Sequence, residues 1–503
     1  MDIQTVVDYL KQIVTTEQIL TDQEDRYVYS FEKLFEEKSA APDIIVTTSS
    51  PREARRIYAV AEHEGFTVAR RGEISNPQDL RRPFVLIDDI PIPELKSIPT
   101  SKSETISILQ EIRKSGYRNP QNLASAIKAL LSGRRQSQCM ECRTCSGYCT
   151  IASSFKSVET WSSKGRTVVV RGLQDGTLPI SKKIADILYT CTECGLCFAQ
   201  CFSDLQVDEA IRVARNKIAE EGFAPEVFHT VAENIMRTGD PGAVPVKQRL
   251  LWMQGLSSQQ LPEEAEVLYW VGCTVANRTP KTAVALLNIL NQGKVRFTIL
   301  NEQEGCCGYV LLATGLWDKA KKVADEVSLK VKRIGVSALV TPCAGCYYTF
   351  KKLYPEILGV SLPCEILHSS HLIERLVNNG RLKLKPIGFT VSYHDPCSLG
   401  RHSQVFEAPR SVLRAIPRLT LVEMPLNRQS ARCCGGGGGL WSFNHEVSME
   451  AASWRLRDLD QLKSDVLATA CPLCQMNFRY TAARRGVSLK VCDIAEIVES
   501  ALG

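Results

Sequence analysis

Short apolar runs alternate with amphipathic stretches over the C-terminal half of the chain. From about residue 265, VLYWVGC, VRFTIL and VSALVTPC have the length and composition of buried strands. Between them, TPKTAVALLNILNQG and DKAKKVADEVSLKVKRIG carry apolar residues at helical spacing. Strands that alternate with helices in this way are typical of βαβ units, so the pattern predicts a mostly parallel sheet.

The first 130 residues carry a smaller version of the same pattern and contain no cysteine. PDIIVTTSS and FTVARRG are typical of strands. PREARRIYAVAEHEG, which begins with proline, predicts a helix between them. This region is therefore expected to form a small αβ unit.

Connector-like sequence divides the chain. PIPELKSIPTSKSE and LSGRRQSQ separate the first region from a segment predicted to be helical, and a second linker runs from GDPGAVPVKQR to LSSQQLPEE. The predicted fold class is α/β overall, with a small N-terminal αβ extension and a helical segment ahead of the alternating part. The expected domains are 1–130, 131–245, 265–380 and 385–503.

Composition narrows the function through its cysteines. The chain has 503 residues with 44% hydrophobic and 23% charged content, and its formal charge of +6 counts every thiol as neutral. Because metal-bound thiolates would lower that charge, it gives no reason to expect nucleic-acid binding. MDIQTVVDYL does not resemble a secretory signal, and no apolar run has the length of a membrane span. Twenty cysteines in such a chain indicate cytoplasmic metal or redox chemistry.

Eight cysteines form two compact runs in the segment predicted to be helical. CMECRTCSGYC and CTECGLCFAQC share the spacing C-x2-C-x2-C-x3-C, which is typical of ligands to a cubane [4Fe–4S] cluster. In two-cluster ferredoxins the fourth cysteine of each run binds the other cluster. Paired C-x2-C motifs also bind zinc, but the third cysteine favours iron and sulfide. The assignment is Cys139, Cys142, Cys145 and Cys201 to one cluster, and Cys191, Cys194, Cys197 and Cys149 to the other.

The C-terminal part is an internal repeat of five cysteines. Between the single cysteine and the adjacent pair lie 32 residues in the first half and 35 in the second, and between the pair and the C-x2-C element lie 35 and 36. Such near-equal spacing indicates duplication. The sets are Cys273, Cys306, Cys307, Cys343 and Cys346, then Cys397, Cys433, Cys434, Cys471 and Cys474.

Adjacent cysteines are unusual metal ligands. Neighbouring side chains on an extended backbone point apart, so two of them cannot hold one iron from the same side. At a loop tip they can hold different irons of one larger cluster. Glycines follow each pair, including Gly308, Gly435 and Gly436, and permit unusual backbone conformations and close approach to inorganic sulfide. Five thiolates exceed the four of a cubane, so we expect one cluster with an extra ligand in each half.

The C-x2-C elements TPCAGC and TACPLC each follow an apolar strand and are predicted to open a helix. The cysteines would then lie at the carboxyl ends of strands, where open αβ sheets bind ligands. A helix N-terminus also stabilises a thiolate by about 0.3–1 kcal/mol.

WVGCTVANRTP, EGCCGYV, YHDPCSLGRH and ATACPLC resemble the cysteine-rich CCG domains of heterodisulfide reductases. Residues 137–503 are similar to the fused ferredoxin-plus-CCG subunit of that family. They are also similar to the iron–sulfur subunits of glycolate and lactate oxidases and of electron-transfer-flavoprotein:quinone oxidoreductases. The resemblance implies an all-α two-cluster ferredoxin domain followed by a duplicated Rossmann-like α/β CCG domain.

The same resemblance implies the cofactors and the chemistry. Each five-cysteine set would hold a noncubane [4Fe–4S] cluster, in addition to the two cubane clusters, and a disulfide would be cleaved between the noncubane pair. All ten cysteines of the two sets are then catalytic as well as ligands. Relatives that only pass electrons often have an altered second motif, whereas both motifs are complete in this chain.

The N-terminal region has a resemblance of its own. LTDQEDRYVYSFEKLF and the αβ segment after it are similar to the opening of a FAD-binding glycolate or lactate oxidase subunit. That family continues with a Gly-rich phosphate loop, but this chain continues EISNPQDLRRPF, so no flavin is expected on it. The region is either a remnant used in docking or a stabilising extension.

The expected partner is a flavoprotein, either a FAD-linked dehydrogenase or an electron-transfer flavoprotein, because no cofactor of this chain exchanges a hydride. A hetero-oligomer is therefore expected, with a membrane cytochrome or quinone as a further partner at the inner face of the membrane. An alternative function is an electron conduit from a flavin dehydrogenase to quinone without a disulfide substrate. A zinc-stapled interaction protein is the third class.

Four residues outside the motifs have simpler interpretations. Cys364 and Cys492 lie in apolar stretches and are expected to be buried core thiols. His368 and His371 are expected to be helix-start residues with satisfied hydrogen bonds.

Three polar residues flank Cys397, namely His394, Asp395 and His402. They either donate protons to a nascent thiolate or shape the loop by hydrogen bonding, and the sequence leaves both interpretations open.

Overall fold

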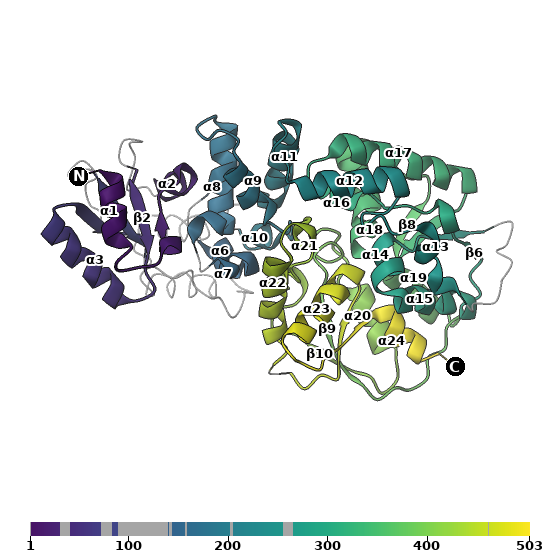
Figure 1. The fold of residues 1–503 in the computed structure, drawn as a ribbon. Helices are drawn as coiled ribbons and strands as arrows, with labels where there is room; N and C mark the ends of the chain where they lie inside the picture. Colours follow the sequence, from purple (N-terminus) through teal and green to yellow (C-terminus); the bar gives the residue numbers. More distant parts are fainter. Residues whose placement is uncertain are drawn as a thin grey trace, which may run out of the picture. The chain divides into compact units, whose positions relative to one another are not determined.

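The computed structural model describes residues 2–30, 41–71, 83–88, 139, 143–155, 158–201, 205–254, 265–460 and 462–502. The chain forms two compact units. The first comprises Met1–Leu188 and Gln200–Ile211, and the second comprises Tyr189–Ala199 and Arg212–Gly503. Figure 1 traces the first unit from purple to blue and most of the second from teal to yellow.

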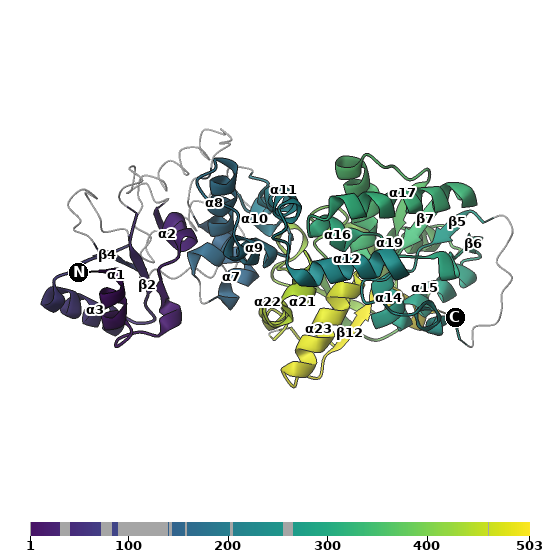
Figure 2. The same cartoon turned by 45° about the horizontal axis from the view of Figure 1, so that its top comes forward.

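The first unit opens with a four-stranded sheet in the order β1-β2-β4-β3. Its strands are β1 (Ile19–Leu20), β2 (Ile44–Thr47), β3 (Thr67–Arg70) and β4 (Phe84–Asp88), and only β1 pairs antiparallel. Helices α1 (Ile3–Leu10), α2 (Gln23–Ser30) and α3 (Pro51–Glu64) accompany it (Figure 2). The predicted strand–helix–strand unit is present as β2, α3 and β3.

Helix α3 shows how the local sequence sets these boundaries. The Ser50 side chain accepts a hydrogen bond from the Glu53 amide at the helix start, and Pro51 occupies the first helical position. Gly65 ends the helix in a left-handed conformation with φ of 80°. Ile57 and Ala61 on one face of α3 are buried with Ile44 of β2.

The middle of the chain is helical in its described residues. The helices are α6 (Thr144–Tyr148), α7 (Thr150–Ser154), α8 (Ser163–Gln174), α9 (Lys182–Tyr189), α10 (Leu196–Ala199), α11 (Val207–Glu220), α12 (Glu226–Thr238) and α13 (Val246–Arg249). The connectors predicted at 91–104 and 131–138 and part of the linker at 255–264 lie outside the described residues.

The second unit contains two parallel sheets. The first has β5 (Val267–Tyr269), β6 (Phe297–Thr298), β7 (Ala338–Thr341) and β8 (Glu365–His368), in the order β6-β5-β7-β8. The other has β9 (Thr390–His394), β10 (Thr420–Glu423), β11 (Val466–Thr469) and β12 (Lys490–Asp493), in the order β10-β9-β11-β12. Both sheets therefore have the same strand order along the chain, and the α/β fold class with parallel sheets is confirmed.

Helices connect the strands in each half. They are α15 (Pro280–Gln292), α17 (Trp317–Ile334) and α19 (Ser369–Asn378), then α20 (Glu407–Arg414), α22 (His445–Arg457) and α24 (Ile494–Ser500). Helix α15 of the first half packs against α24 of the second, and α19 packs against α20 (Figure 1). Across the first of these contacts, the Thr282 hydroxyl donates to Glu496 at 2.7 Å. One apolar core runs through both halves.

Candidate metal centre

The first five-cysteine set lies at three junctions of the first half. Cys273 opens α14 (Cys273–Arg278), shortly after the end of β5. The pair Cys306 and Cys307 precedes α16 (Tyr309–Ala313). Cys343 is the N-cap of α18 (Ala344–Tyr348), and its sulfur accepts a hydrogen bond from the Cys346 amide at 3.4 Å. Strand ends and helix starts thus position these thiols, as the sequence predicts.

The second set repeats this arrangement. Cys397 follows β9, and the pair Cys433 and Cys434 precedes α21 (Leu440–Phe443). Cys471 is the N-cap of α23 (Pro472–Arg484), which contains Cys474. The Sγ atoms of Cys434 and Cys474 are 3.1 Å apart.

The ten thiols form one continuous series of neighbours. Hydrogen-bonding contacts connect Cys273 to Cys306, then to Cys307, Cys346 and Cys343. In the second half they connect Cys471 to Cys474, then to Cys434, Cys433 and Cys397. Cys343 and Cys471 are themselves in contact, so the two sets meet.

Proton sharing in this series stabilises particular thiolates. Hydrogen bonds from Cys306 and Cys346 lower the pKa of Cys307 to about 6. Hydrogen bonds from Cys433, Cys474 and His394 hold the pKa of Cys434 well below its usual value. The thiolate is the form that binds metal, and neighbouring thiols lower the pKa of Cys471 in the same way.

Glycine amides direct hydrogen bonds at the paired cysteines. The Gly308 amide donates to the Cys306 sulfur at 3.4 Å. Those of Gly435 and Gly436 donate to Cys433 at 3.2 Å and Cys434 at 3.5 Å. These are the three glycines expected to contribute to cofactor binding.

Further along the glycine run, the close approach is to protein. Gly438 has φ of 60°, and a Cβ atom there would lie 2.5 Å from the Cys191 carbonyl oxygen. At Gly437 it would lie 2.9 Å from the Thr192 carbonyl oxygen. The sequence suggested approach to inorganic sulfide, whereas these two glycines allow the loop of the second ferredoxin-type run to pack directly against the second set.

That loop also contacts the second set through sulfur. Cys433 lies 3.4 Å from the Thr192 hydroxyl. A hydrogen bond from Cys433 lowers the pKa of Cys194 to about 5. Glu193 between them has φ of 51° and accepts from the guanidinium groups of Arg212 and Arg215, each at 2.9 Å.

The remaining cysteines of the two ferredoxin-type runs are placed as follows. Cys145 lies in α6, Cys149 separates α6 from α7, and Cys197 lies in α10. Cys139 and Cys201 are partly buried, and Cys142 lies outside the described residues. The division of these eight cysteines between two clusters stays a prediction.

A cavity of about 290 Å³ opens among the two sets. Nine of the ten cysteines line it, all except Cys433. Apolar residues on the other walls include Val231, Val310, Leu473 and Met476. Charged and polar residues there include Asp240, Asn277 and the exposed Arg278.

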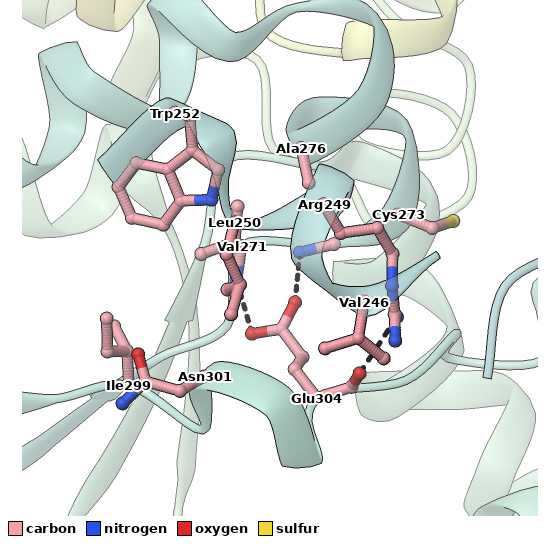
Figure 3. A pocket seen from close by; sticks show the side chains of 11 residues that line it. Val246, Arg249, Leu250, Trp252, Val271, Cys273, Ala276, Ile299, Asn301 and Glu304 are labelled. Atoms are coloured by element: carbon pink, nitrogen blue, oxygen red, sulfur yellow. Dashed lines mark hydrogen bonds between the residues drawn. The ribbon is translucent and has the colours of Figure 1, made fainter. Parts of the chain in front are cut away.

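A smaller pocket behind Cys273 shows how its backbone is held (Figure 3). The buried Glu304 carboxylate accepts hydrogen bonds from the amides of Val271 at 3.0 Å and Gly272 at 2.6 Å. Burial raises the pKa of Glu304 to about 7. Arg249 donates to the Glu304 carbonyl at 3.0 Å, and the Cys273 sulfur points away from this carboxylate. Sequence reasoning missed Glu304, although its position two residues before the paired cysteines was a signal.

The polar residues flanking Cys397 hold backbone and buried charge. Both Asp395 oxygens pair with Arg410, at 2.6 and 2.9 Å, and Arg410 pulls the pKa of Asp395 down despite the opposing effect of burial. His402 contacts the Glu193 carbonyl at 2.9 Å and stacks on Tyr348. These contacts favour the loop-shaping interpretation for both residues.

His394 differs, because the Arg455 Nε donates to its Nδ1 at 3.3 Å. The proton of the neutral ring is thereby placed on Nε2, and the Cys434 thiolate acts electrostatically on the ring. His394, Cys434 and Cys474 have ligand atoms within 4.8 Å of one another.

His368 and His371 are helix-start residues, as predicted, and together form a capping box at α19. Cys492 is buried, also as predicted. Cys364 is partly exposed, so its prediction as a fully buried thiol was wrong; it lies just before β8, at the edge of the core.

The converging donors are sulfur atoms in a mainly apolar cavity, which fits iron–sulfur clusters by the chemistry of the ligands. Comparison with family models agrees. A cysteine-rich CCG domain matches residues 267–351 and 391–479, and a 4Fe-4S dicluster domain matches 135–205.

Similarity to named relatives shows which family the chain belongs to. The D-type polypeptide of the dihydromethanophenazine:CoB–CoM heterodisulfide reductase of Methanosarcina acetivorans is 32% identical over 327 residues, which cover 64% of this chain and 80% of the relative. This chain belongs to the HdrD family of heterodisulfide reductases. As a member it is an iron–sulfur oxidoreductase polypeptide.

Other relatives carry the names of different oxidoreductases. One polypeptide of a CoM/CoB fumarate reductase from Methanothermobacter marburgensis is 27% identical and covers 83% of both chains. An EtfAB:quinone oxidoreductase from Syntrophomonas wolfei is 29% identical over 63% of this chain and 47% of its own length. Among the described helices of this HdrD-family chain, none is long and apolar enough to cross a membrane.

Proposed function

We propose that this HdrD-family protein relays electrons between a flavoprotein partner and two noncubane [4Fe–4S] clusters, and that a disulfide is reduced, or a thiol pair oxidised, at its central cavity. The two five-cysteine sets would hold the noncubane clusters, and the eight cysteines of the ferredoxin-type runs would hold two cubane clusters. When bound, the clusters supply single electrons. Two electrons from the partner and two protons from solvent convert one disulfide into two thiols.

The observation that carries this proposal is the single cavity lined by both sets. Clusters held by the two sets would occupy neighbouring parts of this space and lie side by side, as cleavage of a disulfide between them requires. Contact between Cys343 and Cys471 brings the two sets together at that space. The apolar walls would exclude water from a bound disulfide and strengthen electrostatic interactions inside the cavity.

This chain's residues have separable tasks in such a reaction. Cys307 and Cys434, whose thiolates are stabilised by neighbouring thiols, would anchor the clusters. Glu304 fixes the backbone that leads into Cys273. The flavin is assigned to the partner protein. The name of the quinone oxidoreductase relative, which includes EtfAB, is consistent with such a division.

The test compares anaerobically purified wild type with Cys434→Ser, supplied with reduced methyl viologen and a panel of disulfides. A serine hydroxyl is too weakly acidic to replace the thiolate, so disulfide reduction should fall at least a hundredfold while the cubane signals persist in electron paramagnetic resonance. Cys364→Ser is the matched control, because Cys364 lies outside both sets and is partly exposed.

Full disulfide turnover in Cys434→Ser would contradict the proposal. A parent protein that reduces no disulfide, yet transfers electrons rapidly from a flavoprotein to quinone, would establish the conduit function instead.

A further inference from the structure

Arg401 joins the second five-cysteine set to the loop of the second ferredoxin-type run. The residue is 7% exposed. Its Nε atom donates to the Cys194 carbonyl at 2.7 Å, and one terminal nitrogen donates to the carbonyls of Gln429, at 3.3 Å, and Ala431. A single side chain therefore fixes Cys194 relative to the segment that leads into Cys433.

The charge of Arg401 has no acidic partner within the described part of the chain. Among those residues, no carboxylate forms an ion pair with its guanidinium group. Its second terminal nitrogen is buried without a hydrogen bond there. The sulfurs of Cys194, Cys397 and Cys433 interact with it electrostatically, and its charge also lowers the pKa of the neighbouring His402, which burial lowers most. A buried cation is costly unless compensated, and in this place only sulfur ligands offer negative charge.

The first half has a different residue at the equivalent position. Arg401 lies four residues after Cys397, and Asn277 lies four residues after Cys273. Asn277 donates to the buried Asp240 carboxylate at 2.7 Å, and the negative charge of Asp240 acts on Cys273. The duplicated motif thus carries a cation beside one set and an anion beside the other.

Other charges near the second set do not cancel this difference. Asp395 is neutralised by Arg410, and Asp458 pairs with both the buried Arg455, at 2.7 Å, and Arg432, at 3.8 Å. Near the first set, Glu304 lies with Arg249, whose guanidinium lowers the pKa that burial raises. Among the described residues, Arg401 forms no ion pair with a carboxylate in the second half, and Asp240 forms none with a cationic side chain in the first.

We propose that Arg401 raises the reduction potential of the cluster held by the second set above that of the first, which makes the second set the entry point for electrons into the pair. This rests on the cluster assignment of the proposed function. A nearby positive charge favours the reduced state, which carries one more negative charge, and the effect is strong in a buried site. Contact between Cys433 and the Cys194 loop places that entry point beside the ferredoxin-type run.

The test is a potentiometric titration of the holoprotein, without any disulfide, followed by electron paramagnetic resonance. Cys434→Ser identifies the second-set signal by its loss. Arg401→Met should lower the reduced-to-oxidised ratio of that signal about tenfold at a fixed potential, which is about 59 mV for one electron. Arg401→Lys should shift it less, and the first-set signal should not move.

Arg278→Met is the matched control, since Arg278 lines the same cavity but is exposed, and solvent should screen its charge. If Arg401→Met loses iron, the test compares Arg401→Lys with Arg401→Gln instead, because these two variants differ in charge. The inference would be overturned if the reduction potential of the second-set cluster were the same with and without the charge at residue 401. It would also be overturned if the first-set cluster were the easier one to reduce in the wild type. Wild-type protein without any second-set signal would overturn the cluster assignment itself.

A parent inactive on disulfides but retaining the Arg401-dependent shift would refute only the disulfide chemistry. The potential is measured at equilibrium and requires no substrate. The two proposals therefore fail in different ways.

Discussion

His368 bridges the two halves at the level of a single side chain. Its Nε2 lies 3.3 Å from the Pro342 carbonyl and 3.1 Å from that of Ala470. Nδ1 accepts from the Ser370 amide at 3.1 Å, so the Nε2–H of a neutral ring serves both carbonyls. Each carbonyl belongs to the residue immediately before a C-x2-C element, and His368 therefore holds both elements in place.

The buried imidazole predicts a pH dependence of stability. Burial, with a smaller contribution from His371, lowers the pKa of His368 to about 3, against 6.5 in an unfolded chain. As pH falls below 6.5, the imidazole becomes protonated in the unfolded chain but stays neutral in the folded protein. The free energy of unfolding therefore decreases progressively toward pH 3. Between pH 6.5 and 5 the loss is about 2 kcal/mol.

His368→Gln, which cannot titrate, should remove this part of the slope. Denaturant unfolding of both proteins at several pH values measures the difference, so acid sensitivity common to their clusters cancels. Parallel pH profiles for the two proteins would show that the pKa of His368 is the same in the folded protein as in the unfolded chain.

The sequence predicted that His368 starts a helix, because a polar residue followed by Ser and a periodic apolar segment is a local signal. It could not reveal the bridge to Ala470, since a contact across 102 residues leaves no local pattern. Arg401 was missed for the same reason. Ligand cysteines, in contrast, are recognisable because their chemistry requires fixed spacing along the chain.

At the scale of elements, the glycine loop before α21 has a steric requirement that can be measured. Gly438→Ala would place a Cβ 2.5 Å from the Cys191 carbonyl and also strain a residue with φ of 60°. We expect loss of iron from the second set and a decrease of more than about 2 kcal/mol in the free energy of unfolding, the combined cost of strain and a backbone clash.

Gly486→Ala is the matched control for that loop. Gly486 has φ of 66° with nothing within 4 Å of an added Cβ, so it isolates the backbone strain, about 1 kcal/mol. Iron content and urea unfolding of both variants separate the two effects. Equal costs would show that the close approach to Cys191 is unimportant.

The N-terminal sheet contributes to a buried charge network of the first unit. Arg71, which follows β3, contacts Glu159 at 3.3 Å, and Arg143 contacts the same carboxylate at 2.6 Å. Thr160 donates to Asp25 of α2 at 2.5 Å. These contacts favour the stabilising role over docking for the N-terminal region (Figure 2 shows α2 and β4 in this region).

Glu159→Gln should therefore destabilise the first unit. Burial alone would raise the pKa of Glu159, but Arg143, Lys164 and Arg71 bring it far below the usual range, so the group is a carboxylate. Its removal leaves the buried Arg143 guanidinium without this carboxylate, whereas Arg71 keeps its pair with Asp88 at 2.9 Å, and the cost should be about 3–5 kcal/mol. Urea unfolding measures this, with the exposed Glu62→Gln as control. A cost below about 1 kcal/mol would indicate that water reaches the network.

Element prediction from sequence succeeded where periodicity was strong. Helix α15 and strands β5 and β7 lie within their predicted stretches, and α17 begins one residue before its stretch, at Trp317. The five residues of β4, FVLID, were not predicted, because the turn-rich sequence before them offered no boundary. The membership of Tyr189–Ala199 in the second unit also could not be predicted, since it arises from packing against residues more than 200 positions away, such as the 241-position contact of Thr192 with Cys433.

At the scale of the whole second unit, the cavity predicts substrate preference. Its walls beyond the cysteines are mainly apolar, and among the described residues Arg278 is the cation lining it and Asp240 the carboxylate. The Asp240 carboxylate is buried and accepts hydrogen bonds from Asn277 and from the Gly242 amide, so the exposed Arg278 is the charged group that a substrate would meet. Disulfides with apolar substituents and one carboxylate should be reduced with a higher kcat/KM than those with several charges. Arg278→Gln should cost the monocarboxylate about fivefold, or about 1 kcal/mol, and leave an uncharged disulfide unaffected.

Steady-state assays with dibutyl disulfide, its monocarboxylate analogue and cystine measure this preference. If cystine were the better substrate, the charge of the cavity would have to come from a partner or from residues outside the described ranges.

The contact between Thr192 and Cys433 spans 241 positions. During synthesis, three cysteines of the second ferredoxin-type run leave the ribosome long before the glycine loop that packs over them exists. At about 5–20 residues per second, this delay lasts on the order of tens of seconds. Completion of that metal site is therefore a late event in the life of each molecule, and oxygen or stray metal ions that reach the nascent chain have this interval in which to act.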